Sequence, residues 1–389
     1  MTAERRPPSP LLAVALVALA ALYLVLFLHA ENQWALAALL AAAAAGLVAA
    51  ARSGLTAKVG RSIRAHPGTF DLAAILGVLA VGVLFHGEHF ALLMLTTSLL
   101  LMCAALGLTL QFGYAGLANF AGAAFFGIGC YTAAVVTKYT ALPTLLDIPL
   151  GGLMAALIGS VLILPVLRTR GHYAALVTIA FGILFRTFLE VNDTLGGPQG
   201  LLVGPLDVLG FSFATPIRIG PVEASFYLSY FLLALLLLVF SFGLVRRLER
   251  SWIGLSLDSI RLDEIASACF GLHIARWKVL AFTLGNALAG AAGAVYAHMI
   301  GFIAPNNFTF GDSLVLVSIV LLGGIGNPWG VTVAAAFVVL LPEKFQIIQE
   351  YRFLLYAVLV IAILLFRPEG LLPRGLRNYV PGRATRTAP

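Results

Sequence analysis

The chain has 389 residues, of which 61% are hydrophobic and only 11% are charged, and its formal net charge is +7. A soluble globular protein has about 25% charged residues, so this composition excludes a water-soluble fold. The positive charges flank apolar runs instead of forming a basic surface on a polar domain, so the net charge does not indicate nucleic-acid binding.

Apolar runs recur along the whole chain, and a membrane helix needs roughly 20 such residues to cross about 30 Å of hydrocarbon. Runs of that length or somewhat shorter occupy residues 11–29, 34–51, 72–85, 90–110, 117–137, 149–166, 173–190, 225–245, 279–298, 313–325, 329–341 and 353–366. The expected fold is therefore an all-α integral membrane protein, a polytopic helical bundle of about ten to twelve transmembrane or re-entrant segments. The short runs at 313–325 and 329–341 leave open a re-entrant pair in place of two crossings.

The first run could belong to a signal peptide, because Arg5 and Arg6 precede it. It is longer than a typical apolar signal region of about 7 to 15 residues, and Leu28-His29-Ala30 is a poor cleavage site. We therefore expect a retained first helix.

Lysine and arginine predict the orientation of the chain. With every apolar run taken as a crossing, most of these residues fall on one side, which also receives both termini and the loop 246–278. The positive-inside rule places that side in the cytoplasm.

The longest polar break between two apolar halves covers residues 255–282. Asp263 can cap a short helix from Glu264 to about Phe270, and Gly271 offers the left-handed residue that ends it. One face of that helix would then carry Ile265, Cys269 and Leu272. Such a helix could lie on the membrane surface or dock a soluble partner, and composition alone does not choose between these.

Several stretches in the same order resemble the permeases of ABC importers, most closely the LivM-type permeases of branched-chain amino-acid importers. They are DEIA at 263–266, ACFG at 268–271, RWK at 276–278, LGLTLQFGYAGLANFAGAAFFGIGCYT at 106–132, the stretch 167–201 and LLGGIGNPWG at 321–330. The resemblance covers about residues 90–375 and includes the coupling loop 246–278. Residues 1–89 form N-terminal transmembrane helices without a recognised family match, and residues 376–389 form a basic cytoplasmic tail.

The resemblance implies a permease subunit that forms the path for branched-chain amino acids, or a related small polar solute, in a bacterial inner membrane. It implies a LivH-like second permease, LivG-like and LivF-like ATPase subunits that hold ATP and Mg, and a periplasmic or extracellular solute-binding protein. The chain itself would be no enzyme and would bind no cofactor. The residues expected to couple to the ATPases are Asp263, Glu264, Ile265, Ala266, Cys269 and Gly271.

Polar residues inside the apolar runs are the other candidate functional residues. Gln111, Tyr114 and Asn119 surround two glycines that weaken a helix, so they could line a solute path or simply bond to neighbouring backbone. Asn286 is a weaker candidate of the same kind. Arg186 and Glu190 lie one turn apart and are expected to form an intramembrane ion pair, functional or structural.

The remaining cluster, His86-Gly87-Glu88-His89, fills a turn between two runs and predicts neither a metal site nor catalysis. An ion-driven secondary transporter would need carboxylates near the middle of the membrane, and only Glu190 falls inside a run. A membrane enzyme would need a convergent acid–base or metal set. Both alternatives leave the resemblance of the loop 246–278 unexplained.

Overall fold

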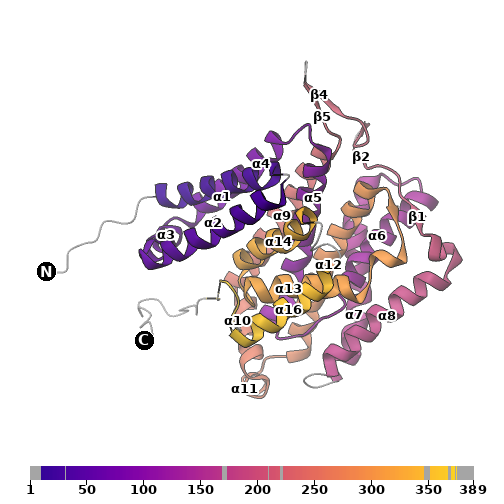
Figure 1. Cartoon of the computed structure of the whole chain (residues 1–389). Helices are drawn as coiled ribbons and strands as arrows, with labels where there is room; N and C mark the ends of the chain where they lie inside the picture. Colours follow the sequence, from indigo (N-terminus) through magenta and orange to yellow (C-terminus); the bar gives the residue numbers. More distant parts are fainter. Residues whose placement is uncertain are drawn as a thin grey trace.

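The computed structural model describes residues 10–30, 32–168, 173–208, 210–219, 222–345, 351–366, 369–372 and 374. Within these residues, nine helices are long and apolar enough to cross a membrane (Figure 1). They are α1 (Leu11–His29), α2 (Gln33–Arg52), α4 (Pro67–Leu84), α5 (His89–Thr109), α7 (Asp147–Arg168), α8 (Tyr173–Val191), α9 (Tyr227–Arg250), α12 (Ile274–Ile300) and α13 (Phe310–Gly323). The helical membrane bundle expected from the apolar runs is confirmed.

Three shorter or less apolar helices run alongside these nine: α6 (Gly122–Tyr139), α14 (Pro328–Lys344) and α16 (Arg352–Phe366). The remaining helical pieces are α3 (Leu55–Ala65), the π turn η1 (Leu110–Tyr114), α10 (Trp252–Leu262), α11 (Glu264–Cys269) and the 3-10 turns η2 (Thr144–Leu146), η3 (Asp193–Leu195), η4 (Gly197–Gln199) and η5 (Pro305–Asn307). The basic tail expected at 376–389 lies outside the described residues.

Short antiparallel strand pairs mark one end of the bundle, opposite the end that carries α11 (Figure 1). They are β1 (Leu201–Leu202) with β6 (Phe302–Ile303), β2 (Asp207–Val208) with β3 (Phe211–Ser212), and β4 (Ile217–Ile219) with β5 (Val222–Ala224). In the first pair Leu201 lies opposite Ile303, so the loop after α8 is fixed to the loop after α12.

Helix α14 runs between the two ends, and the stretch from η5 through α13 is long and apolar enough to cross a membrane, so the structure favours two crossings over a re-entrant pair. Lys344, at the end of α14, donates to the carbonyl oxygens of Leu28 and Ala30 at the end of α1. The turn that joins α13 to α14 lies at the opposite end, where the Tyr114 hydroxyl donates to the Gly326 carbonyl at 3.2 Å.

The core is organised around α5 and α12, which approach each other through glycines. A Cβ atom at Gly107 would collide with the carbonyl oxygen of Gly285, and one at Gly129 of α6 would collide with the carbonyl oxygen of Gly290. Small residues at such contacts let helix backbones approach closely where lipid gives no hydrophobic drive for association. The glycines therefore set the distances between the core helices.

Candidate functional site

The loop 246–278 carries the short helix that the sequence predicted. Asp263 has an extended backbone, and its Oδ1 accepts from the amides of Ile265 at 2.9 Å and Ala266 at 3.0 Å. Helix α11 ends at Cys269, and Gly271 has a left-handed φ of 83°. Both predicted ends of the helix are confirmed: the Asp263 side chain accepts hydrogen bonds from free amides of the first turn, and the left-handed Gly271 turns the chain after the last.

Two contacts that the sequence did not reveal hold this loop against the core. The Lys278 ammonium at the base of α12 donates to Glu264 Oε1, and the Lys278 side chain is almost buried. The rings of Trp252 and Trp277 meet edge to face with centroids 5.0 Å apart. The sequence analysis did not predict helix α10, which it treated as part of the polar break. It also did not predict that the Ser251 side chain caps this helix by accepting from the Ile253 amide.

The tip of the loop exposes large apolar side chains to a degree that is unusual outside a membrane. Leu262, Ile265 and Phe270 are 84%, 80% and 88% exposed, and Cys269 is exposed as well. The predicted face is partly wrong, because Leu272 is half-buried and Phe270 takes its place at the surface. Since α11 lies at the extreme end of the molecule (Figure 1), this patch has the character of a docking surface.

Three of the four residues expected near the solute path meet inside the subunit. Gln111, in the π turn after α5, donates through Nε2 to Asn286 Oδ1 at 2.8 Å and to the Phe282 carbonyl at 3.0 Å. Asn119 Nδ2 donates to Gln111 Oε1 at 2.7 Å, and Asn119 Oδ1 accepts from the Ala121 amide at 2.9 Å. We name Gln111, Asn119 and Asn286 the amide cluster.

The amide cluster is almost completely buried and joins the π turn to α12. Its hydrogen bonds support the alternative in which these side chains satisfy neighbouring groups, while a part in the solute path stays a prediction. One donor is left over: Asn286 Nδ2 has no acceptor within the described residues. It packs against Gly159 of α7, where a Cβ would lie 2.6 Å from it.

Tyr114, the fourth residue, belongs to a different set of contacts at the end that carries α11. The Arg374 guanidinium lies 4.3 Å from the centroid of the Tyr114 ring and pairs with both oxygens of Asp258 in α10, at 2.6 and 2.8 Å. Arg261 of α10 donates to the Gly113 carbonyl at 2.6 Å. Helix α10 is therefore bonded to the π turn directly through Arg261 and indirectly through Arg374.

The charge on Arg374 is maintained despite its burial. Burial by itself lowers the pKa of a guanidinium, but the hydrogen bonds to Asp258 and the nearby Tyr114 and Glu249 outweigh it, so the Arg374 pKa is raised. In a site shielded from water, a cation that contacts both an aromatic face and a carboxylate binds strongly to both, so Arg374 links Tyr114 firmly to Asp258.

Arg186 and Glu190 form the pair that their spacing suggested. Arg186 Nε donates to Glu190 Oε1 at 2.8 Å, and Nη2 donates to Asn306 Oδ1 at 2.9 Å. Both side chains are partly exposed near the end of α8. The pair therefore also connects α8 to the loop that precedes α13.

A buried acidic–basic pair at the strand-pair end was not predicted. His298 Nε2 lies 3.0 Å from Asp147 Oδ2, and both side chains are fully buried. His298 Nδ1 faces the Gly204 carbonyl at 2.8 Å, so the imidazole connects Asp147 of α7 to the loop after β1. Asp147 lies two residues before the predicted run 149–166, and His298 is the last residue of the run 279–298, so no sequence pattern relates the two.

Comparison with known proteins identifies the family. A family model described as "Branched-chain amino acid transport system / permease component" matches residues 90–364. The high-affinity branched-chain amino acid transport system permease protein LivM of Escherichia coli K12 is 37% identical over 316 residues, 78% of this chain and 74% of that protein. LivM of Salmonella typhimurium is 36% identical over 294 residues, 72% of this chain and 69% of that protein.

More distant relatives include a probable branched-chain amino acid transport permease protein LivM of Methanocaldococcus jannaschii, 24% identical over 69% of this chain and 89% of that protein. No solved structure gave a significant match. On the family model and the two LivM proteins above 35% identity, the chain belongs to the family of permease components of branched-chain amino acid transport systems.

Proposed function

We propose that this membrane protein is the permease subunit of an ATP-driven importer that moves branched-chain amino acids or a related small polar solute. Family membership and the helical membrane bundle support transport as the activity. The proposed partners are a second permease of the LivH type, two ATPase subunits that hold ATP and Mg, and a solute-binding protein on the outside. Relatives named LivM and LivH occur among the similar proteins, which supports a transport system with several subunits.

The proposed orientation places α11 and both termini in the cytoplasm of a bacterial cell and the strand pairs outside its inner membrane. The distribution of lysine and arginine supports it. The native cysteines offer a direct test, because Cys269 on α11 is exposed while Cys103 and Cys130 are buried. An impermeant maleimide should modify Cys269 only from the cytoplasmic side, and Leu202→Cys in a Cys269→Ser chain only from outside. Labelling of both positions from one side would contradict the orientation.

The observation that carries the mechanism is the continuous set of contacts from the exposed tip of α11 to the core. Glu264 of α11 holds Lys278 at the base of α12, and Arg261 of the adjacent α10 holds the Gly113 carbonyl in the π turn. A partner that pushes on Ile265 or Phe270 therefore acts on α12 and on the turn beside the amide cluster. Alternating access would follow when the ATPases close on ATP and displace this loop.

The decisive variant is Ile265→Asp. Burying most of an isoleucine is worth roughly 1.5 to 3 kcal/mol, and a carboxylate without a partner adds a desolvation cost. ATPase binding should therefore weaken by about tenfold to a hundredfold or more, with solute uptake lost in reconstituted vesicles. Because Ile265 is exposed and contributes little to the fold, the thermal stability of the purified subunit should not change.

The matched control is Leu202→Asp, an equally exposed apolar residue at the opposite end of the molecule. Leu202→Asp should co-purify with the ATPases as well as the unmodified chain does. Full ATPase binding together with full uptake by Ile265→Asp would show that the tip of the loop is not the coupling surface.

A further inference from the structure

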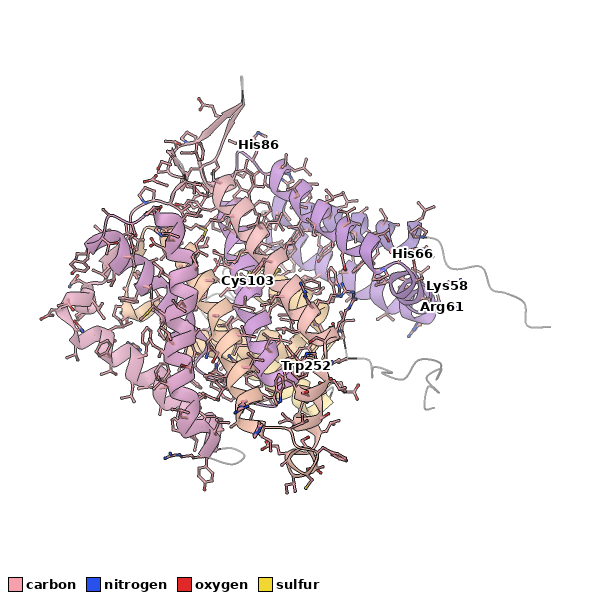
Figure 2. The ribbon with its side chains drawn as sticks, turned by 180° about the vertical axis from the view of Figure 1, so that it is seen from behind. Lys58, Arg61, His66, His86, Cys103 and Trp252 are labelled. Carbon is pink, nitrogen blue, oxygen red and sulfur yellow. The ribbon has the colours of Figure 1, made fainter. Side chains whose placement is uncertain are left out.

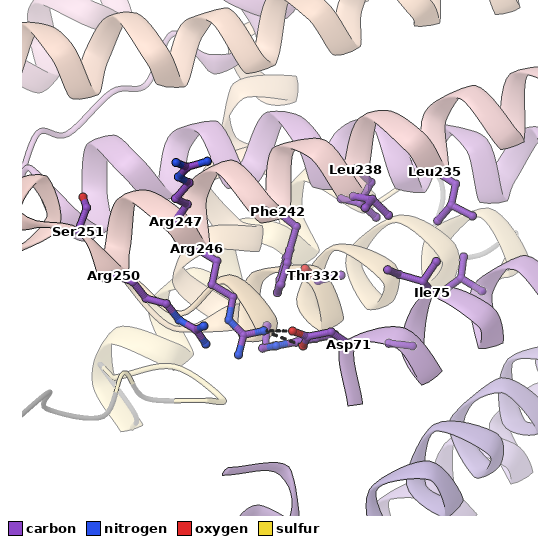
Figure 3. A pocket seen from close by; sticks show the side chains of 15 residues that line it. Asp71, Ile75, Leu235, Leu238, Phe242, Arg246, Arg247, Arg250, Ser251 and Thr332 are labelled. Carbon is purple, nitrogen blue, oxygen red and sulfur yellow. Dashed lines mark hydrogen bonds and ion pairs between the residues drawn. The ribbon is translucent and has the colours of Figure 1, made fainter. Parts of the chain in front are cut away.

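A groove separates α4, which precedes the segment matched by the family model, from α9 and α14 of that segment. Figure 3 shows its lining side chains. Its volume is about 640 Å³, within the usual range for small-molecule sites. Most of the wall is apolar and comes from α4 and α9, including Ile75, Leu235, Leu238 and Phe242.

The end of the groove that lies toward α10 is basic. Both oxygens of Asp71 accept from Arg246 Nη1, so this arginine is neutralised. Arg247 and Arg250 also line the groove and are exposed, and neither has a carboxylate partner within the described part of the chain. In Figure 3, Arg250 extends toward the Arg246–Asp71 pair, whereas Arg247 leaves α9 on the other side in this view.

The length of the groove along α9 is close to the thickness of one leaflet of a bilayer. From Leu235 to Arg247, α9 rises about 18 Å, close to the roughly 15 Å of hydrocarbon in one leaflet. Arg246, Arg247 and Arg250 lie in the last two turns of α9, at one end of this apolar span, which is where a lipid spanning the leaflet would have its headgroup. Gly243 lies on the groove wall with nothing within 4 Å of the place where a Cβ would be, so the space beside α9 is open.

We propose that this groove binds one anionic phospholipid of the leaflet on the α11 side, with an acyl chain along α9 and the phosphate at Arg250. The apolar wall matches a hydrocarbon chain, and the uncompensated arginines match a negatively charged headgroup. Neutral headgroups would leave these two cations without a counter-charge. The site is independent of the transported solute, so it goes beyond the proposed function.

The test uses the purified full-length chain incubated with equal amounts of phosphatidylglycerol and phosphatidylcholine, followed by native mass spectrometry of the lipid that stays bound. The unmodified chain should retain one phosphatidylglycerol in preference to phosphatidylcholine. Arg250→Gln should reduce that preference about fivefold, which is the selectivity one arginine near an anionic surface provides. Arg52→Gln is the control, because Arg52 is an exposed arginine at the end of another membrane helix.

Gly243→Leu tests the position of the acyl chain. Its side chain would enter open space, so the protein should keep its melting temperature while the retained lipid is lost regardless of headgroup. Equal retention of the two lipids by the unmodified chain would overturn the proposal. An unchanged preference in Arg250→Gln, or unchanged retention in a folded Gly243→Leu protein, would overturn it as well.

Discussion

In the most apolar 18-residue window between α5 and the end of the π turn, 83% of the residues are buried inside the subunit, whereas the matching windows of α2 and α4 bury only 6% and 11%. The first region meets its neighbours through glycine contacts and buried amides. The second presents most of its apolar surface outward. Two apolar helices of similar length can therefore have opposite surroundings. The buried stretch is distinguished by the backbone contact of Gly107 with Gly285 and by the hydrogen-bonded amide of Gln111.

The N-terminal helices join the rest of the molecule through a small apolar cluster, in which Phe27 and Leu36 pack with Met94 and Leu340, through Gly82 against Phe231 of α9, and through polar contacts. Asp71 of α4 pairs with Arg246 of α9, and Lys344 of α14 bonds to the end of α1. Figure 2 shows Lys58, Arg61 and His66 at the outer edge of this region, far from Cys103 in the core. Substitutions of the same type in the two regions should therefore differ widely in effect.

The largest difference between the two regions is expected when a glycine is replaced by leucine. Gly129→Leu places a side chain where even a Cβ would collide with the Gly290 carbonyl, so α6 and α12 must separate. Overpacking of this kind costs at least about 1 to 3 kcal/mol, and backbone contact leaves little room to relax. We expect no monodisperse protein on size-exclusion chromatography. Gly46→Leu in α2 meets nothing within 4 Å and should purify normally, and equal behaviour of the two variants would refute the comparison.

The next largest difference is expected between substitutions of two histidines that each lie beside an acidic residue, one buried in the core and one exposed near the N-terminal helices. Among the described residues, His298→Leu leaves buried Asp147 with only the Thr137 hydroxyl as a donor, and breaking a buried pair costs about 3 to 5 kcal/mol. The exposed pair of His29 and Glu88, 3.9 Å apart, should contribute less than about 1 kcal/mol. Thermal unfolding in detergent should show a large loss for His298→Leu and little change for His29→Ala. Similar shifts for both would mean that the buried pair contributes no more than the exposed one.

A smaller difference is expected when an asparagine in each region is replaced by alanine. Asn286→Ala removes one of the two acceptors of Gln111 Nε2 and leaves the Phe282 carbonyl, and an interhelical hydrogen bond in a membrane protein is worth about 0.6 to 2 kcal/mol. Asn32→Ala removes an exposed cap of α2, where Asn32 Oδ1 accepts from the Trp34 amide at 3.0 Å. A lower melting temperature for Asn286→Ala alone is the expected result, and uptake measurements on the same variant would show whether the amide cluster also affects transport.

The smallest effect on the core is expected from deletion of residues 1–54. This removes α1 and α2 together, so the direction of every later helix is kept, and the core contacts at Gly107, Gly129 and the amide cluster are untouched. The shortened chain should insert and melt within a few degrees of the full chain. A chain that no longer inserts or folds would show that these helices are needed to assemble the core.

Local features of this fold could be predicted from the sequence. Run length located the membrane helices, and the Asp263 cap with Gly271 located α11, because each depends on residues close together in the chain. Boundaries differed where a helix continues into water: the run 225–245 became α9, which extends to Arg250 and ends in arginines.

Contacts between distant residues could not be predicted in this way. The Glu264–Lys278, Asp147–His298 and Asp258–Arg374 pairs depend on how helices pack, and no periodicity in the sequence relates their members. The exposure of Phe270 depends on the turn at Gly271, which directs the chain back toward α12 before Leu272 can join the outer face. Tyr114 and Asn119 are near in sequence, yet the π turn and the left-handed Gly116 send them into separate clusters.

The glycine contacts at Gly107–Gly285 and Gly129–Gly290 have a consequence for movement. Where two backbones touch, no side chain can change rotamer to let one helix slide or roll against the other. Helices α5, α6 and α12 should therefore move as one block during a transport cycle. The displacements that open and close a passage would then occur at the borders of this block, where α8 and α4 leave most of their surface uncovered.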